Sequence, residues 1–313
     1  MQKFVYGIDV GGTNIKIGLF IKESMNMIDQ LEIKTPESNH QVAIFQSIFN
    51  TVVSMNQRNN LSMDQIYGIG LAVPCPVKNG LVKHCPNLSW RDMDVIASMR
   101  GFFPSDIQVV VSNDANVAAY GENMVLENPY MNAVFYTLGT GVGGGIIIDG
   151  NLLEGGTGLG GEIGHMFMFD GATKDCGCGS RGCLEQICGT AGILSYANEL
   201  SQTSPTILDM SQLTVKAVFD AAKLNDSVAY QVVLRLADYI ARSASILAVV
   251  LDPEVFIIGG GISKAGDFLI QLVETQYKNY ARFTTTKIPF ILARTGNNAG
   301  IIGAAYMAKK QQA

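Results

Sequence analysis

Apolar and polar residues alternate along much of the chain as they do in strands, and stretches with helical spacing lie between them. Residues 4–21 read FVYGIDVGGTNIKIGLFI and predict a strand, a tight glycine turn and a second strand, because apolar positions alternate with Lys16 and Gly18. Residues 133–149, AVFYTLGTGVGGGIIID, predict the same hairpin again. Two such hairpins, each followed by further strands and helices, indicate a duplicated α/β chain, with two unrelated hairpins as the alternative.

The remaining pattern predicts further helices and buried strands. Apolar side chains in residues 228–251 fall on one helical face, and Asp252-Pro253 ends this helix because the residue before a proline disfavours helical geometry. We expect other helices at residues 40–60 and from about residue 299. Apolar runs bounded by turn residues predict strands at residues 66–73, 107–111 and 255–258.

The length of 313 residues suggests two domains, and with 48% hydrophobic residues the chain can bury a large core. We expect a first domain at residues 1–117, joined by the C-terminal helix at residues 299–313, and a second domain at residues 118–298. No low-complexity linker marks the boundary, so it depends on the order of the predicted elements.

Charge and hydropathy argue against two classes of partner. The net charge is −5 and there is no basic tract, which disfavours a nucleic-acid surface. The longest apolar stretch, residues 246–251, is far shorter than the ~18 residues that a membrane span needs. The N-terminus enters a strand at once, without the layout of a signal peptide. We therefore expect a cytoplasmic protein that binds neither nucleic acid nor membranes.

One histidine and three cysteines lie close together in the sequence and match the Cys₃His ligand set of a closed tetrahedral zinc site. Glu162 and Glu185 flank this segment. The other cysteines, Cys75, Cys85 and Cys188, are scattered, and we expect them to be ordinary thiols of a reduced protein. The four expected zinc ligands are His165, Cys176, Cys178 and Cys183.

The two glycine turns can be tested against known phosphate-binding motifs. Residues 139–144 match GxGxxG, but a strand follows them where the dinucleotide fold requires a helix, so that interpretation fails. No GxxxxGK[ST] motif is present. A glycine turn can still hold phosphate with converging backbone N–H groups, and Asp9 adds a carboxylate for Mg²⁺ before the first turn. A plain tight turn is the alternative for each hairpin.

Asn113 and Asp114 stand where a buried strand gives way to a helix. Both residue types favour a helix N-cap, which is the simpler interpretation. The other is a general base at the carboxyl end of a strand, where ligands of α/β proteins bind. In phosphoryl transfer such a base orients a hydroxyl and accepts its proton.

Together these motifs resemble the ROK family of sugar kinases and regulators (repressor, open reading frame, kinase). The phosphate motifs are DVGGTNIKIG at 9–18 and LGTGVGGGII at 138–147, and SNDANVAA at 112–119 resembles the catalytic-aspartate motif. The sugar and zinc motifs are GGEIGH at 160–165 and CGCGSRGCLE at 176–185. IIGGGIS at 257–263 resembles the adenosine motif, and NNAGIIGAA at 297–305 resembles the closing helix.

The resemblance implies an actin-like, ribonuclease-H-like fold in which two α/β domains close over Mg²⁺-ATP and a hexose. It implies Asp114 as the base for the sugar 6-hydroxyl, and a histidine that faces both zinc and sugar. It also implies a homodimer. The implied sugar ligands are Asn87, Asn113, Asp114, Glu162, His165 and Glu185. The implied Mg²⁺-ATP ligands are Asp9, Gly11, Gly12, Thr13, Asn14, Lys16, Gly139, Thr140, Gly141, Gly143, Gly259, Gly260 and Gly261.

The leading hypothesis is therefore an ATP-dependent hexose kinase, most simply for glucose, with structural zinc. Pro74-Cys75-Pro76 departs from the Pro-Gly that the family usually shows at its sugar-side loop, which puts the choice of sugar in doubt. N-acetylmannosamine, fructose, allose and a phosphorylated glycoside remain alternative substrates. A sugar-responsive regulator without its DNA-binding domain and a catalytically silent sugar-binding protein are the alternatives outside the kinases.

Overall fold

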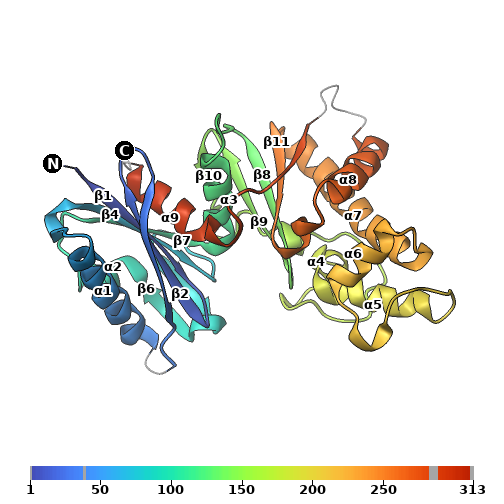
Figure 1. The fold of residues 1–313 in the computed structure, drawn as a ribbon, viewed down its shortest axis with the longest axis horizontal. Helices are drawn as coiled ribbons and strands as arrows, with labels where there is room; N and C mark the ends of the chain where they lie inside the picture. Colours follow the sequence, from blue (N-terminus) through green and yellow to red (C-terminus); the bar gives the residue numbers. More distant parts are fainter. Residues whose placement is uncertain (1, 38–39, 282–287, 311–313) are drawn as a thin grey trace. The chain divides into compact units, whose positions relative to one another are not determined.

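The computed structural model describes residues 2–37, 40–281 and 288–310, which belong to two compact units (Figure 1). The first unit combines residues 1–129, 152–160 and 297–313, and the second combines residues 130–151 and 161–296. Each unit is built on one five-stranded sheet with helices packed against it. No helix among the described residues is both long enough and apolar enough to cross a membrane.

The first unit has the strand order β3-β2-β1-β4-β7, with β1 antiparallel to β2 and parallel to β4. One face of this sheet packs its aliphatic side chains on α1 and α2, while the C-terminal helix packs on other residues of β1, β2 and β7. The strands are β1 (Phe4–Val10), β2 (Asn14–Ile21), β3 (Met27–Lys34), β4 (Ile66–Val73) and β7 (Gln108–Asn113), and a separate hairpin pairs β5 (Leu81–Cys85) with β6 (Trp90–Asp94). The helices are α1 (His40–Arg58), α2 (Val95–Arg100), α3 (Asp114–Met124) and α9 (Ala299–Lys309).

Glycines in the central strands allow α9 to lie directly on the first sheet. A Cβ at Gly7 of β1 would lie 1.8 Å from the carbonyl oxygen of Ile301, and one at Gly70 of β4 would lie 1.9 Å from that of Ala304. Both distances are far shorter than van der Waals contact, so only glycine fits at these positions. The sequence thus dictates a backbone-to-backbone contact between the C-terminal helix and strands near the N-terminus.

The second unit repeats this arrangement with the strand order β10-β9-β8-β11-β12. Its first two strands again form an antiparallel hairpin, and β8 again pairs in parallel with the next strand, β11. The strands are β8 (Ala133–Leu138), β9 (Val142–Ile148), β10 (Asn151–Leu152), β11 (Val255–Gly259) and β12 (Phe290–Leu292). The helices are α4 (Glu185–Cys188), α5 (Thr190–Ser201), α6 (Val215–Lys223), α7 (Ser227–Leu251) and α8 (Asp267–Tyr280).

The matching strand orders confirm the predicted duplicated α/β fold. When only the strands of each five-stranded sheet are numbered in chain order, both sheets have the order third, second, first, fourth, fifth. The predicted strand at residues 66–73 and the predicted helix at residues 228–251 coincide with β4 and α7 to within one residue. Short 3-10 helices complete the chain at η1 (Met63–Gln65), η2 (Pro86–Leu88), η3 (Ile163–His165), η4 (Met210–Gln212), η5 (Gly261–Ala265) and η6 (Gly296–Asn298).

The division into units differs from the boundary expected at residue 117, because α3 packs tightly on α9. A Cβ at Gly303 would lie 1.9 Å from the Val117 carbonyl oxygen, and one at Gly121 would lie 2.4 Å from the Ala299 carbonyl oxygen. Since α9 lies on the first sheet, α3 stays with the first unit. Residues 152–160 also belong to this unit rather than to the second.

Candidate active site

The first glycine turn joins β1 to β2 and presents two backbone N–H groups. Gly11 N–H donates to the Asn14 carbonyl at 2.9 Å, and the Thr35 hydroxyl donates to the Gly11 carbonyl at 2.6 Å. Within the described part of the chain, the N–H groups of Gly12 and Thr13 have no hydrogen-bond partner. Two adjacent free donors in a glycine turn are suited to bind phosphate oxygens.

The second glycine turn, between β8 and β9, has the same threonine bond but a tighter backbone hydrogen bond, which spans two residues instead of three. Gly139 N–H donates to the Gly141 carbonyl at 3.0 Å, and the Thr190 hydroxyl donates to the Gly139 carbonyl at 2.9 Å. The N–H groups of Thr140 and Gly141 again lack partners among the described residues. Each unit therefore holds a turn that is fixed by a threonine from a distant segment and that leaves two donors for a ligand.

Asp9 precedes the first turn at the end of β1. Burial raises the pKa of its carboxyl above the ordinary value, and neighbouring Lys16 lowers it in part. Its Oδ2 atom would lie 2.6 Å from a Cβ at Gly300, so the carboxylate fits against the start of α9 only because position 300 is glycine. A largely buried carboxylate oxygen is the type of ligand that Mg²⁺ prefers.

Lys16 and Asn14, both predicted to bind ATP, already have partners within the first unit. Lys16 Nζ donates to the Asn297 carbonyl at 3.0 Å, and Asn14 Nδ2 donates to Glu32 Oε1 at 2.7 Å. Both side chains therefore help to join the first hairpin to its neighbours in this structure.

A cavity of about 560 Å³ opens beside the second turn. Its size is within the range that is typical of small-molecule sites. The sequence indicated Gly139, Thr140 and Gly261 but missed the rest of the lining, because α6 carries no motif and its cavity-facing residues resemble an ordinary solvated helix face. The lining residues are Gly139, Thr140, Thr190, Val215, Lys216, Phe219, Asp220, Lys223, Gly261, Ile262, Lys264 and Ala265.

The other predicted glycines of the second unit, Gly143, Gly259 and Gly260, do not line this cavity. A Cβ at Gly260, where φ is +82°, would lie 2.3 Å from the Leu138 carbonyl oxygen, and one at Gly259 would lie 2.7 Å from the Phe135 ring. Gly143 pairs with Thr137 inside the β8–β9 ladder. These glycines allow the strands to pack, and only Gly261 of the triplet lines the cavity.

The four predicted zinc ligands lie together, with all their ligand atoms within 4.8 Å of one another. His165 Nδ1 is 3.6 Å from Cys176 Sγ, and Cys178 Sγ is 3.7 Å from Cys183 Sγ. A tetrahedral zinc ion with Zn–S bonds of 2.3 Å separates its sulfur ligands by about 3.8 Å. The spacing and the soft donor set therefore fit zinc.

Burial and the neighbouring Cys178 and Cys176 thiols raise the pKa of Cys183 to about 12. An ionised thiolate at this position therefore needs a nearby cation, which a coordinating metal supplies.

Glu185 connects the zinc-ligand cluster to the second glycine turn. Its Oε2 accepts a hydrogen bond from Val142 N–H at 3.0 Å, and its Oε1 lies 3.7 Å from Cys176 Sγ. A Cβ at Gly141 would lie 2.0 Å from Oε2, so a larger residue there would displace the Glu185 carboxylate from its present position. A second cavity of about 390 Å³ is lined by this turn and the cysteine loop together.

Glu162 and His165 are held at the side of β9. Glu162 precedes η3, and His165 is its last residue. A Cβ at Gly164 would lie 1.8 Å from the Val142 carbonyl oxygen, so this 3-10 helix lies directly on the strand. The ring nitrogen Nδ1 of His165 faces Cys176, which assigns that nitrogen to the metal side.

Asn113 and Asp114 divide the roles that the sequence left open. Asn113 is the N-cap of α3, and its Oδ1 accepts from Ala115 N–H at 3.0 Å and from Asn116 N–H at 3.3 Å. Asp114 is the first helical residue, and its Oδ1 accepts from Ala115 N–H at 2.7 Å. The capping role therefore belongs mainly to Asn113.

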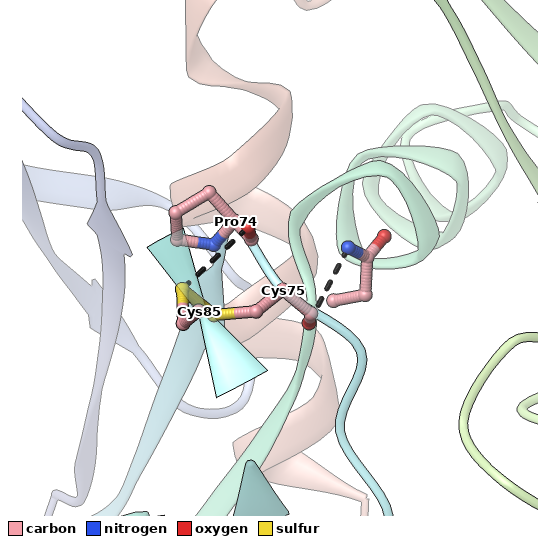
Figure 2. The surroundings of a disulfide bond; sticks show 4 residues. Pro74, Cys75 and Cys85 are labelled. Carbon is pink, nitrogen blue, oxygen red and sulfur yellow. Dashed lines mark hydrogen bonds between the residues drawn. A yellow bond between two sulfur atoms is a disulfide. The ribbon is translucent and has the colours of Figure 1, made fainter. Parts of the chain in front are cut away.

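The expectation that Cys75 and Cys85 are ordinary thiols of a reduced protein is wrong, because the structure joins them in a disulfide (Figure 2). They are 10 residues apart in the sequence. Between them the chain turns back on itself, with Lys78 bridged to Leu81, and the sequence pattern did not reveal this turn. Cys188 is a free and buried thiol, as expected.

The comparisons with known proteins agree on one family. The ROK family model matches residues 5–311. The chain is 35% identical over 99% of its length to a glucokinase of Halalkalibacterium halodurans, of which it covers 96%, and 30% identical over 96% of its length to an N-acetylmannosamine kinase of Yersinia pestis, of which it covers 97%. A crystal structure of a ROK family glucokinase from Streptomyces griseus in complex with glucose and AMPPNP has a TM-score of 0.75 at 27% identity, with 99% of this chain and 100% of that chain covered. The chain belongs to the ROK family.

Proposed function

We propose that this protein is an ATP-dependent hexose kinase that transfers the γ-phosphoryl group of Mg²⁺-ATP to the 6-hydroxyl of glucose. The observation that carries the proposal is the pair of glycine turns, each with two free backbone donors and the same threonine bond. The similarity to glucokinases supports the sugar, and the 30% identity to N-acetylmannosamine kinases makes that sugar the second candidate.

In this proposal Asp114 is the general base. As the sugar O6 forms its bond to the γ-phosphorus and the bond to the leaving β-phosphate oxygen breaks, the O6 proton passes to the Asp114 carboxylate. Asp114 lies in the first turn of α3, and a helix N-terminus stabilises nearby negative charge. An aspartate of ordinary pKa can perform this step, since the base mainly orients the hydroxyl.

The remaining predicted residues bind the two substrates. The donors of both turns hold phosphate oxygens, and Asp9 would hold Mg²⁺, which neutralises the phosphate charge when it is bound. The cavity beside the second turn receives the nucleoside, with Phe219 and Ile262 as its apolar surface and Lys223 among its cations. The sugar hydroxyls are bound by Asn87, Asn113, Glu162, His165 and Glu185.

We assign a structural role to zinc, held by the cluster of one histidine and three cysteines. A metal on Nδ1 of His165 leaves its other ring nitrogen as a hydrogen-bond donor for a sugar hydroxyl. We also propose that the protein works in the cytoplasm, where ATP is made, and as a homodimer, as the resemblance to the family implied. The burial of the Cys75–Cys85 disulfide limits the access of cytoplasmic reductants to it. Light scattering at several protein concentrations tests the dimer, which a constant monomer mass would exclude.

Replacing Asp114 by Asn tests the assigned base. Because the amide cannot accept the proton, kcat with glucose should fall by about 10²–10⁴-fold while the KM for ATP changes little. The exposed Asp106 of the same unit supplies the matched control, Asp106→Asn, which should keep wild-type kcat. Initial rates of ADP formation measure both variants. If the Asp114→Asn variant kept a near-normal kcat, Asp114 would not be the general base.

A further inference from the structure

The Cys75–Cys85 disulfide joins two segments of the first unit (Figure 2). One is hydrogen-bonded to the proposed sugar ligand Asn113, and the other leads into the proposed sugar ligand Asn87. Cys75 lies in the Pro74-Cys75-Pro76 loop directly after β4, and Cys85 ends β5. The two residues are only 2% and 0% exposed. The sulfur atoms therefore have little opportunity to contact a substrate, and any effect of the bond must act through the neighbouring backbone.

On the Cys75 side, the backbone is connected to Asn113. Asn113 Nδ2 donates to the Cys75 carbonyl oxygen at 3.4 Å, which Figure 2 shows as a dashed line. Cys75 N–H donates to the Val73 carbonyl at 2.8 Å, so the loop turns tightly at this point. The Asn113 oxygen already accepts from the first turn of α3. Both ends of the amide thus have a partner, and among the described residues one of its two N–H donors remains for a ligand.

On the Cys85 side, the chain continues directly into the proposed sugar ligand Asn87. Cys85 is the N-cap residue of η2, which contains Asn87. The Asn87 carbonyl oxygen would lie 3.2 Å from a Cβ at Gly12, so this segment also lies against the first glycine turn. Cys85 pairs with Trp90 across the β5–β6 hairpin and lies 3.7 Å (Sγ) from the Pro74 carbonyl oxygen.

We propose that the Cys75–Cys85 disulfide is a positioning element of the sugar site, which holds Asn113 and Asn87 in place and thereby raises the affinity for the hexose. This inference rests on the proposed hexose kinase function. Asp114 is less dependent on the bond, because the Asn113 oxygen caps α3 without the help of Cys75. Loss of the disulfide should therefore change the KM for the sugar much more than kcat.

The bond can be broken and restored chemically. A water-soluble trialkylphosphine attacks one sulfur, the S–S bond breaks, and water supplies the oxygen of the phosphine oxide and the protons of the two thiols. Removal of the phosphine and addition of a small-molecule disulfide reforms the bond by thiol–disulfide exchange, with release of the small thiol. Each state can be verified by thiol labelling and mass spectrometry, and zinc content measured in parallel shows that the cysteine cluster is unaffected.

The experiment measures glucose and ATP kinetics of the oxidised wild type, the reduced wild type and the double variants Cys75→Ser/Cys85→Ser and Cys75→Ala/Cys85→Ala. Loss of one oriented hydrogen bond predicts a KM for glucose that is about 3–10-fold higher in the reduced enzyme and in the variants. The values of kcat and of the KM for ATP should stay within about twofold of the oxidised enzyme. Cys188→Ala is the control that keeps the disulfide. Its KM for glucose should rise on reduction as much as that of the wild type.

The outcomes separate this inference from the function on which it rests. Two results together support the inference. In the wild type, the KM for glucose rises on reduction and returns on reoxidation. In the double variants it is high from the start, and the phosphine does not change it further. If the phosphine does not reach the buried bond, the double variants make the same comparison. An active enzyme whose KM for glucose is the same with and without the bond would overturn this inference alone, even if its thermal stability falls. Absence of the disulfide from air-oxidised protein would also overturn it. An oxidised enzyme that phosphorylates no hexose would overturn the proposed function as well.

Discussion

Asp9 is a carboxylate whose burial opposes its own ionisation. Burial raises the pKa of Asp9 in the folded protein above the value of about 3.9 that it has in an unfolded chain. Between these two pKa values the folded state binds more protons than the unfolded state, so the free energy of unfolding falls as the pH rises through this window. A bound Mg²⁺ would stabilise the ionised Asp9 carboxylate and so offset this loss of stability, in agreement with a functional role for Asp9.

The variant Asp9→Asn should therefore be more stable but less active. At neutral pH, without nucleotide or metal, its melting temperature should exceed that of the wild type by about 1–3 °C, and the difference should shrink as the pH falls and the wild-type carboxyl becomes protonated. Its kcat/KM with Mg²⁺-ATP should fall by about 100-fold or more. Differential scanning fluorimetry from about pH 4 to 8 and steady-state kinetics measure these effects, with Asp106→Asn as the unchanged control. A variant that is less stable than wild type at every pH would refute the account of Asp9.

At the scale of elements, η3, the cysteine loop and α4 form one structure around the proposed zinc ion. Their ligands come from a 3-10 helix that lies on β9 and from a loop that the Glu185 carboxylate connects to the second turn. The free energy of metal binding becomes stability of such a segment when no other core holds it together. The loop residues Phe167, Lys174 and Cys178 are exposed, which agrees with a segment that depends on its metal.

Replacing Cys178 by Ser should release zinc and loosen this segment. We expect about one zinc per chain in the wild type and far less in the variant, with faster proteolysis between residues 166 and 184 and a KM for glucose that is at least several-fold higher. Cys188→Ala removes a buried thiol that is not in the cluster and should keep its zinc. A metallochromic indicator, limited proteolysis and kinetics are the measurements. Unchanged proteolysis and glucose affinity in the zinc-free variant would contradict the structural role.

The sequence predicted elements well where a strong local signal exists. The glycine turns, β4 and α7 have clear periodicity or turn chemistry, and the Cys₃His spacing predicted a cluster that the structure forms. The sequence missed features that depend on contacts between distant segments. The cavity face of α6, the threonine bonds to both turns and the Cys75–Cys85 disulfide are of this kind, because no local pattern records which segments meet.

At the scale of the whole molecule, the duplication gives the chain two glycine turns of similar design, which we propose bind phosphate. In each turn the carbonyl of the first glycine accepts a threonine hydroxyl from outside the hairpin, at 2.6 Å from Thr35 and at 2.9 Å from Thr190. The two following N–H groups are left for a ligand in both cases. Thr35 follows the end of β3 and Thr190 begins α5, so the correspondence lies in the hydrogen bond rather than in the local sequence.

The variants Thr35→Val and Thr190→Val should each weaken ATP binding. Loss of one hydroxyl bond predicts a KM for ATP that is about 2–10-fold higher, with a smaller change in the KM for glucose. Thr51→Val is the matched control, because the Thr51 hydroxyl also donates to a backbone carbonyl, that of Ser47 at 2.8 Å, but within α1. Nucleotide titrations and steady-state kinetics measure the three variants. If Thr51→Val weakened ATP binding as much as Thr35→Val and Thr190→Val do, the effect would not depend on the glycine turns and the proposed role of their threonine bonds would be wrong.

The central claim is that this chain phosphorylates a hexose at its 6-hydroxyl with ATP. Initial rates of ADP formation should be measured with glucose, mannose, fructose, allose, N-acetylglucosamine and N-acetylmannosamine, and each product identified by mass spectrometry and NMR. We predict one ADP for each hexose 6-phosphate formed, with the highest kcat/KM for glucose. ADP formation that no sugar in this panel stimulates would contradict the claim.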